Sequence, residues 1–186
     1  MPWAVGALLA TLLLSGCQAE ETPPAGAFPS VSSGSPSASP ASTSPSPSAS
    51  PSSEIPAAAR EKSQAGAEAF VRYFVKQSAH AWISADPNLI TALSDPDCKS
   101  CASLASTAAQ LRERGHRYAD LPISVVSVDA LTGDEQRQNV AATIDQRAVN
   151  VVDSDGNIVS SDQADSLERT FLLYWEGSGW RVGGIA

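Results

Sequence analysis

Several residue types are scarce in this 186-residue sequence, and each scarcity excludes a class of function. Basic residues are few: 12 Lys and Arg stand against 20 Asp and Glu, and the net charge of −8 argues against a nucleic-acid partner, because phosphate recognition needs clustered cations. A structural zinc site takes four ligands, and only His80 and His116 are available to join a Cys98/Cys101 pair. We therefore expect no metal and no cofactor.

Charge is missing altogether from Thr22 to Ser53. Within that stretch, residues 30–53 contain 13 Ser and 5 Pro among 24 residues. Such a composition buries too little apolar surface to offset the entropy of ordering the chain, so it predicts a disordered stalk. Proline biases the stalk toward extended geometry, at about 3.1 Å per residue.

Long apolar runs are also absent, since the longest one, Ala4–Leu14, has eleven residues. A membrane-spanning helix takes roughly 20, so this run fits the core of a secretory signal peptide instead. It is followed by Leu14-Ser15-Gly16-Cys17, which resembles the lipobox of bacterial lipoproteins. That resemblance implies cleavage before Cys17 and a diacylglycerol on its thiol. We expect a signal peptide at 1–16, a lipidated linker at 17–56 and a folded domain at 57–186.

The first half of the expected domain has helical periodicity. Apolar residues recur at helical spacing through Ala57–Trp82, which predicts one long amphipathic helix. Asp86-Pro87 has the form of a helix start and predicts a short helix over Asn88–Leu93. A third helix is expected over Lys99–Arg114, with Gly115 as its stop.

The second half changes to the alternation of β-strands. Strand patterns occupy 123–128, 140–144, 149–152, 158–159, 171–175 and 180–182, and Asp155-Gly156 predicts a hairpin turn. Helices followed by an antiparallel sheet indicate the α+β class.

This arrangement resembles the nuclear-transport-factor-2-like fold, in which a curved sheet wraps a long helix into a cone. The segments AFVRYFV (69–75), ALSDPDCKSC (92–101) and GWRV (179–182) are similar to a family of actinobacterial lipoproteins that has no assigned activity. The resemblance implies three N-terminal helices packed on a curved, cone-like antiparallel sheet after the Ser/Pro stalk.

Cys98 and Cys101 form a CxxC pair in a chain that we expect to be exported. Thiols outside the cytoplasm persist as disulfides, so a structural disulfide is the leading interpretation. Thiol-disulfide redox chemistry is the alternative, because a helix N-terminus lowers a thiol's pKa. That chemistry is typical of a βαβ setting, whereas a helix and a turn precede this pair.

Cone folds can hold a pocket between helix and sheet, and the candidate residues for it are Tyr73, Trp82, Tyr118, Asp145 and Arg147. Asp145 and Arg147 lie two apart on a strand, share a face and can simply pair. We expect no catalytic residue. An isomerase or hydratase using Tyr and carboxyl groups remains the alternative, since a buried carboxyl can be tuned for acid/base work.

These patterns together predict a lipoprotein anchored on the extracytoplasmic face of the cell membrane. Its domain is expected to act as a non-catalytic module that binds a small molecule or an envelope protein. Its expected partners are therefore the membrane, through the lipid on Cys17, and that unidentified ligand.

Overall fold

The structure is a computed structural model that describes residues 54–134 and 136–186, all within the unit Ser48–Ala186. The expected signal peptide, Cys17 and the Ser/Pro stalk lie outside the described residues. The helical elements come first: η1 (Ala57–Arg60), α1 (Gln64–Ser84), α2 (Asn88–Thr91) and α3 (Lys99–Arg114). The seven strands of the described residues come after the helices. They are β1 (Arg117–Tyr118), β2 (Ile123–Gly133), β3 (Arg137–Gln146), β4 (Val149–Val152), β5 (Ile158–Asp162), β6 (Asp165–Glu176) and β7 (Gly179–Ile185).

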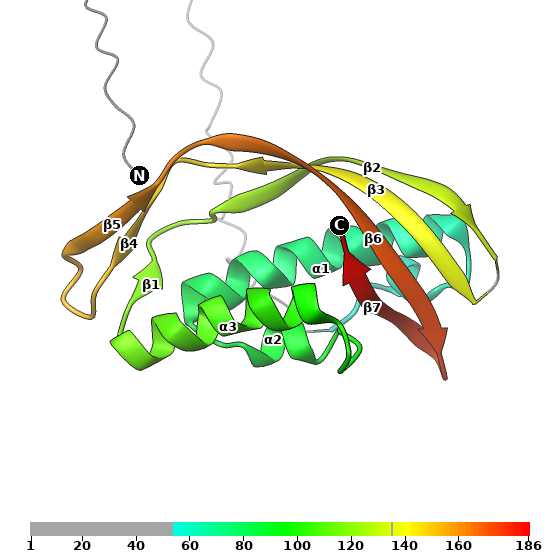
Figure 1. Cartoon of the computed structure of the whole chain (residues 1–186), viewed down its shortest axis with the longest axis horizontal. Coiled ribbons are helices and arrows are strands. Elements are labelled where there is room, and N and C mark those ends of the chain that lie inside the picture. The colour runs from blue at the N-terminus through cyan, green and yellow to red at the C-terminus, as the bar shows by residue number, and fades with distance from the viewer. Residues whose placement is uncertain (1–53, 135) are drawn as a thin grey trace, which may run out of the picture. The chain divides into compact units, whose positions relative to one another are not determined.

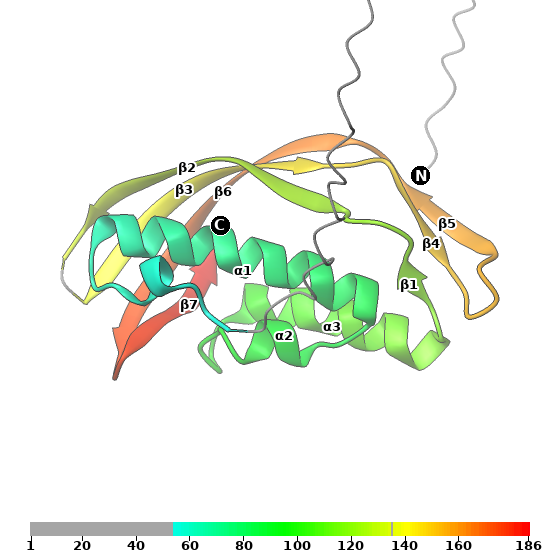
Figure 2. The same cartoon turned by 180° about the vertical axis from the view of Figure 1, so that it is seen from behind.

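The strands form antiparallel sheets around the long helix. β2, β3, β6 and β7 pair in that order, and β1, β4 and β5 form a second, three-stranded sheet. Figure 1 shows the larger sheet arching over α1, with α2 and α3 beside the helix and β4 and β5 at the far end of the arch. In the reverse view of Figure 2, α1 lies in front and the same sheet arches over it and behind it. The expected α+β class with antiparallel sheets is confirmed.

The core lies between α1 and the concave face of the larger sheet. Phe70 and Phe74 on α1 are almost fully buried, and the ring of Phe74 meets Phe171 of β6 edge-on at 6.0 Å between centroids. Val140 of β3 pairs with Phe171 in the register of the sheet and is also buried. Alternate residues of each strand therefore build one side of the core, as the period of two requires.

The prediction of a single helix over 57–82 was wrong at its start. Residues 57–60 form a separate 3-10 turn, and α1 begins at Gln64 with the Ser63 Oγ accepting a hydrogen bond from the Gly66 N–H at 3.0 Å. The carbonyl of Glu61 packs so closely on Gly66 that a Cβ there would overlap it. Trp180 of β7 donates its Nε1–H to the same carbonyl at 2.8 Å. The N-terminal turn is thus held against the closing hairpin.

The third helix matches its expected bounds because both ends have local caps. The Cys98 sulfur accepts from the Cys101 N–H at 3.2 Å, and Gly115 takes a left-handed conformation (φ 67°) that ends α3. The short second helix ends at Thr91 rather than Leu93, because the chain then turns to join the sheet. Ser94 forms a parallel bridge with Val182, so the turn between α2 and α3 lies along the edge of β7.

Candidate functional site

An apolar cavity of about 260 Å³ lies between α1 and the larger sheet, and we call it the cleft. Helix α1 forms one wall, strands β3 and β6 form the opposite wall, and single residues of α3, β2 and β7 complete it. Its lining consists of Phe74, Val75, Ser78, Trp82, Leu104, Ile123, Ile144, Gln146, Leu167, Arg169, Phe171 and Ile185.

The helical wall of the cleft keeps its polar atoms occupied within the protein. Ser78 and Trp82 stand four residues apart and so share a face of α1. The Ser78 hydroxyl donates to the Phe74 carbonyl at 3.0 Å, and the Trp82 indole N–H donates to the Leu104 carbonyl at 3.1 Å. Since buried donors with partners gain little from a new one, this wall offers a ligand mainly apolar contact.

The sheet wall comes from alternate residues of β6. Leu167, Arg169 and Phe171 are two apart, and all three line the cleft. Among the described residues around this cavity, Arg169 is the sole charged one, and no His, Cys, Tyr or carboxylate lines it. The cleft therefore has no acid/base pair with which to move a proton.

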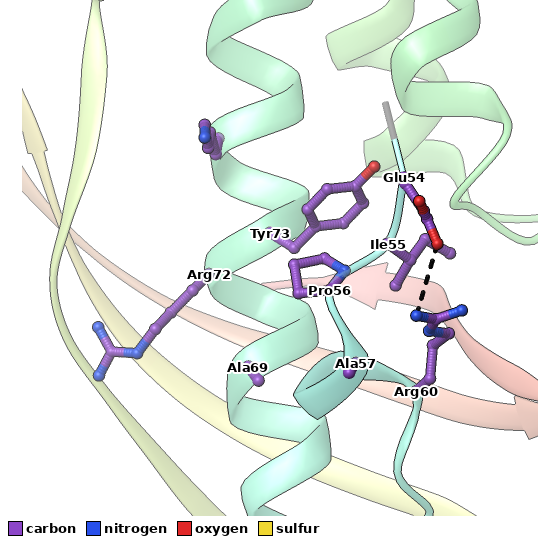
Figure 3. Close-up of a pocket in the computed structure, with 9 residues that line it drawn as sticks. Glu54, Ile55, Pro56, Ala57, Arg60, Ala69, Arg72 and Tyr73 are labelled. Atoms are coloured by element: carbon purple, nitrogen blue, oxygen red, sulfur yellow. Dashed lines mark ion pairs between the residues drawn. The ribbon is translucent and has the colours of Figure 1, made fainter. Parts of the chain in front are cut away.

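A second pocket, of about 630 Å³, lies on another side of α1, between that helix and residues 54–60 (Figure 3). Its rim is charged: the Arg60 guanidinium approaches the Glu54 carboxylate at 3.6 Å, and both side chains are more than half exposed. Figure 3 shows Tyr73 beside Ile55 and Pro56, while Arg72 extends away from them. Burial raises the pKa of the Tyr73 hydroxyl. This pocket is more open to solvent than the cleft, and its lining includes three cationic residues, Arg60, Arg72 and Lys76.

The five candidate pocket residues fall in different places. Trp82 lines the cleft, whereas Tyr73 lines the second pocket. The Tyr118 ring lies 5.9 Å from that of Trp82, and its hydroxyl donates to Asp162 at 2.6 Å. Asp145 and Arg147, at the end of β3, are exposed and line neither cavity.

The Tyr118–Asp162 pair links β1 to the last residue of β5. Burial, followed by the hydrogen bond and the negative charge of Asp162, raises the pKa of the Tyr118 hydroxyl. Tyr118 therefore stays protonated and acts as a hydrogen-bond donor. Tyr118 also packs with Leu111 and Val151 in a minor hydrophobic core. Its hydrogen bond to Asp162 therefore ties β5, the outer strand of the small sheet, to this core.

Of the twelve residues that line the cleft, the sequence predicted only Trp82, and the missed ones include Arg169, Leu104 and Ile185. The only available signal was the pattern of residues 167–171, in which Arg169 takes the same face as Leu167 and Phe171. An arginine on the otherwise apolar face of a strand indicates that the face is not fully buried at that residue. The contribution of α3 and β7 depends on tertiary packing and has no local signal.

The Cys98–Cys101 disulfide is present, which confirms that expectation. Both residues are buried, with exposed fractions of 1% and 2%. The Cys101 sulfur lies 3.7 Å from the Val182 carbonyl oxygen of β7. The disulfide thus closes the turn at the start of α3, which packs against the edge strand β7.

Within residues 54–134 and 136–186, His, Cys, Asp and Glu side chains form no group of three or more that could hold a metal ion. Of the helices described there, none combines the length and apolarity needed to cross a membrane.

Comparison with known proteins places the chain in a family. Residues 36–185 match the family described as "Family of unknown function (DUF6318)". The chain belongs to the DUF6318 family. No curated protein matches this DUF6318 chain.

Solved structures resemble the DUF6318 domain in fold. The intermembrane space region of the chloroplast protein ARC6 has a TM-score of 0.51 at 17% identity, over 67% of this chain and 95% of that one. An uncharacterised protein with a cystatin-like fold from Caulobacter vibrioides has a TM-score of 0.42 at 16% identity, over 62% and 83% of the two chains. Another similar structure carries NTF2 in its name. At these identities the likeness concerns the fold alone.

Proposed function

We propose that this DUF6318 protein is an actinobacterial-type envelope lipoprotein whose domain is a non-catalytic binding module. A lipid on Cys17 anchors it at the extracytoplasmic face of the cell membrane, and the Ser/Pro stalk precedes a cone-like domain of three helices on a curved sheet. Two features support this location. The segment from Leu14 to Cys17 has the order of a lipobox, and the Cys98–Cys101 disulfide suits an oxidising compartment.

The observation that carries the binding role is the composition of the cleft. A cavity of about 260 Å³ with apolar walls would be filled in a purely structural domain, since protein interiors are close-packed. The polar atoms of its helical wall, on Ser78 and Trp82, already have partners in the protein. Apolar walls with few polar groups are typical of sites that bind small molecules.

The binding role is tested with a small, neutral, environment-sensitive dye, prodan, titrated into the full chain. We expect saturable binding that Leu104→Trp weakens at least tenfold, because the indole occupies the cavity. Leu131→Trp is the matched control, since Leu131 is 46% exposed on β2. Unfolding curves of both variants show whether the fold is retained. Equal dye binding by the wild type and Leu104→Trp would remove the cleft as the site.

The anchor is tested separately by intact-mass analysis of membrane-extracted protein. We expect a diacylglycerol adduct on a chain that begins at Cys17. A soluble product cleaved elsewhere would contradict the anchor and leave the binding role untouched.

An isomerase- or hydratase-type enzyme is the second candidate, and the hydrogen bond between Tyr118 and Asp162 is the observation that favours it. The pair stands next to Trp82 but does not line the cleft. If it were catalytic, Tyr118→Phe would abolish turnover while retaining dye affinity in the cleft. A thiol-disulfide role for Cys98 has less support, because its sulfur is almost fully buried.

A further inference from the structure

Arg169 occupies an unusual position in the apolar register of β6. It stands between Leu167 and Phe171 on the strand face that lines the cleft, yet it is exposed. On the β7 side of β6, Phe171 pairs with Ile185, and Thr170 and Ala186 exchange backbone hydrogen bonds of 2.9 and 3.0 Å. The residue opposite Arg169 on β3 is the small Ala142. Arg169 is thus an exposed, charged residue on a mostly apolar cavity, and we call its position the mouth of the cleft.

The guanidinium of Arg169 retains most of its hydrogen-bonding capacity. Its Nη1 donates to the carbonyl of the preceding residue, Glu168, at 2.8 Å, and within the described ranges it forms no ion pair. A guanidinium carries five N–H donors in a planar fork, so an edge is left for another acceptor. The Glu168 carboxylate is on the opposite face of the strand and does not line the cleft.

We propose that the cleft binds a single-chain carboxylate, with its alkyl chain between α1 and the sheet and its head group on Arg169. This inference rests on the proposed binding function and names the ligand class for the same site. One carboxylate balances one guanidinium and matches its fork with two parallel hydrogen bonds. A phosphate monoester would bring a charge of about −1.5 to −2 to a mouth with one cation.

The size of the cleft limits the chain. Its 260 Å³ lies below the roughly 300 Å³ at which sites for drug-sized ligands begin. One short alkyl chain fits this space, and a two-chain lipid does not. Each buried methylene should tighten binding about fourfold, and the charged pair at an exposed mouth should add about tenfold.

The test uses the full chain carrying Cys17→Ser, so that no attached acyl chain competes for the cleft. Titration calorimetry compares hexanoate, octanoate, octanol, octylamine and octyl phosphate. We expect octanoate to bind about tenfold more tightly than octanol or octylamine, and roughly fifteenfold more tightly than hexanoate, from two added methylenes. Octyl phosphate should bind no more tightly than octanoate.

Substitutions at the mouth assign the preference to one residue. Arg169→Gln should reduce octanoate to the affinity of octanol, and Arg169→Lys should retain part of the preference, because it keeps the charge but loses the fork. Arg147→Gln is the matched control, since Arg147 is an exposed arginine of the same domain that does not line the cleft. It should bind octanoate as the wild type does.

The outcomes separate this inference from the proposed function. Equal binding of octanoate and octanol, or an octanoate preference that survives Arg169→Gln, overturns the carboxylate assignment while the cleft remains a binding site. Tighter binding of octyl phosphate than of octanoate also overturns it in favour of a phosphate head group. Failure of octanol and prodan alike to bind the wild type overturns the proposed function itself.

Discussion

Removal of the Cys98–Cys101 disulfide should lower the melting temperature of the domain by about 7 °C. The bond closes a loop of four residues, for which the chain-entropy relation gives about 2 kcal/mol of stabilisation. A domain of about 130 residues unfolds with an entropy near 0.27 kcal/mol/K, which converts that free energy into the expected shift. The value is modest because so short a loop restricts the unfolded chain little.

The best variant for this measurement is Cys98→Ser combined with Cys101→Ala. A serine at position 98 keeps an acceptor for the N–H of residue 101, so the cap of α3 is preserved. Alanine at position 101 avoids leaving a hydroxyl buried beside Val182. Calorimetry of the full chain, with and without reductant, should show the same loss on reduction of the wild type as on substitution. Cys17→Ser should leave the melting temperature of the domain unchanged.

Two results would refute this reasoning. If reductant fails to lower the melting temperature of the wild type, the disulfide does not restrict the unfolded chain as the entropy relation assumes. If dithiothreitol reduces the folded protein as fast as it reduces the unfolded one, the sulfurs are reachable in spite of their burial. That second result would favour the redox role over the structural one.

Three further substitutions, one of them with a matched control, test individual positions. Ala85→Gly should raise the free energy of unfolding, measured by urea titration, by about 0.5 kcal/mol, because Ala85 ends α1 at φ 52°, where an L-residue is strained. The control is Ala102→Gly, at an exposed helical position of α3, which should lower the free energy of unfolding by about 1 kcal/mol. Tyr118→Phe should cost about 1.5 kcal/mol at neutral pH, because the hydrogen bond to Asp162 is lost. Since the pKa of Tyr118 is raised on folding, its contribution is present below about pH 10 and is lost as pH rises through the folded pKa; the wild type should lose stability in alkali more steeply than Tyr118→Phe. Trp180→Phe should cost about 1 kcal/mol by removing the donor to the turn before α1, seen as a lower urea midpoint; an unchanged midpoint would contradict that anchoring role.

The bounds of a helix could be predicted from the sequence where the residues that cap it are next to it in the chain. The bounds of α3 follow from Cys98 and Gly115, which cap it without help from the rest of the domain. The start of α1 was misplaced because the break between η1 and α1 depends on a tertiary contact. Gly66 admits the close approach of the Glu61 carbonyl, and Trp180, more than a hundred residues away, donates a hydrogen bond to that carbonyl.

The site itself was harder to predict than the elements that form it. Aromatic and charged residues near helix 1 and β3 are natural candidates for a pocket, but strand geometry sends Asp145 and Arg147 outward, because Ile144 and Gln146 between and beside them face the cleft. The cation of the cleft instead belongs to β6, where Leu167, Arg169 and Phe171 share one face. The residues around position 169 do not reveal that this face borders a cavity, because the opposite wall comes from α1 and Leu104 of α3, far away in the sequence. The place of Arg169 at the cleft therefore depends on tertiary packing and on the register of β6 with β3, which sets Arg169 opposite Ala142.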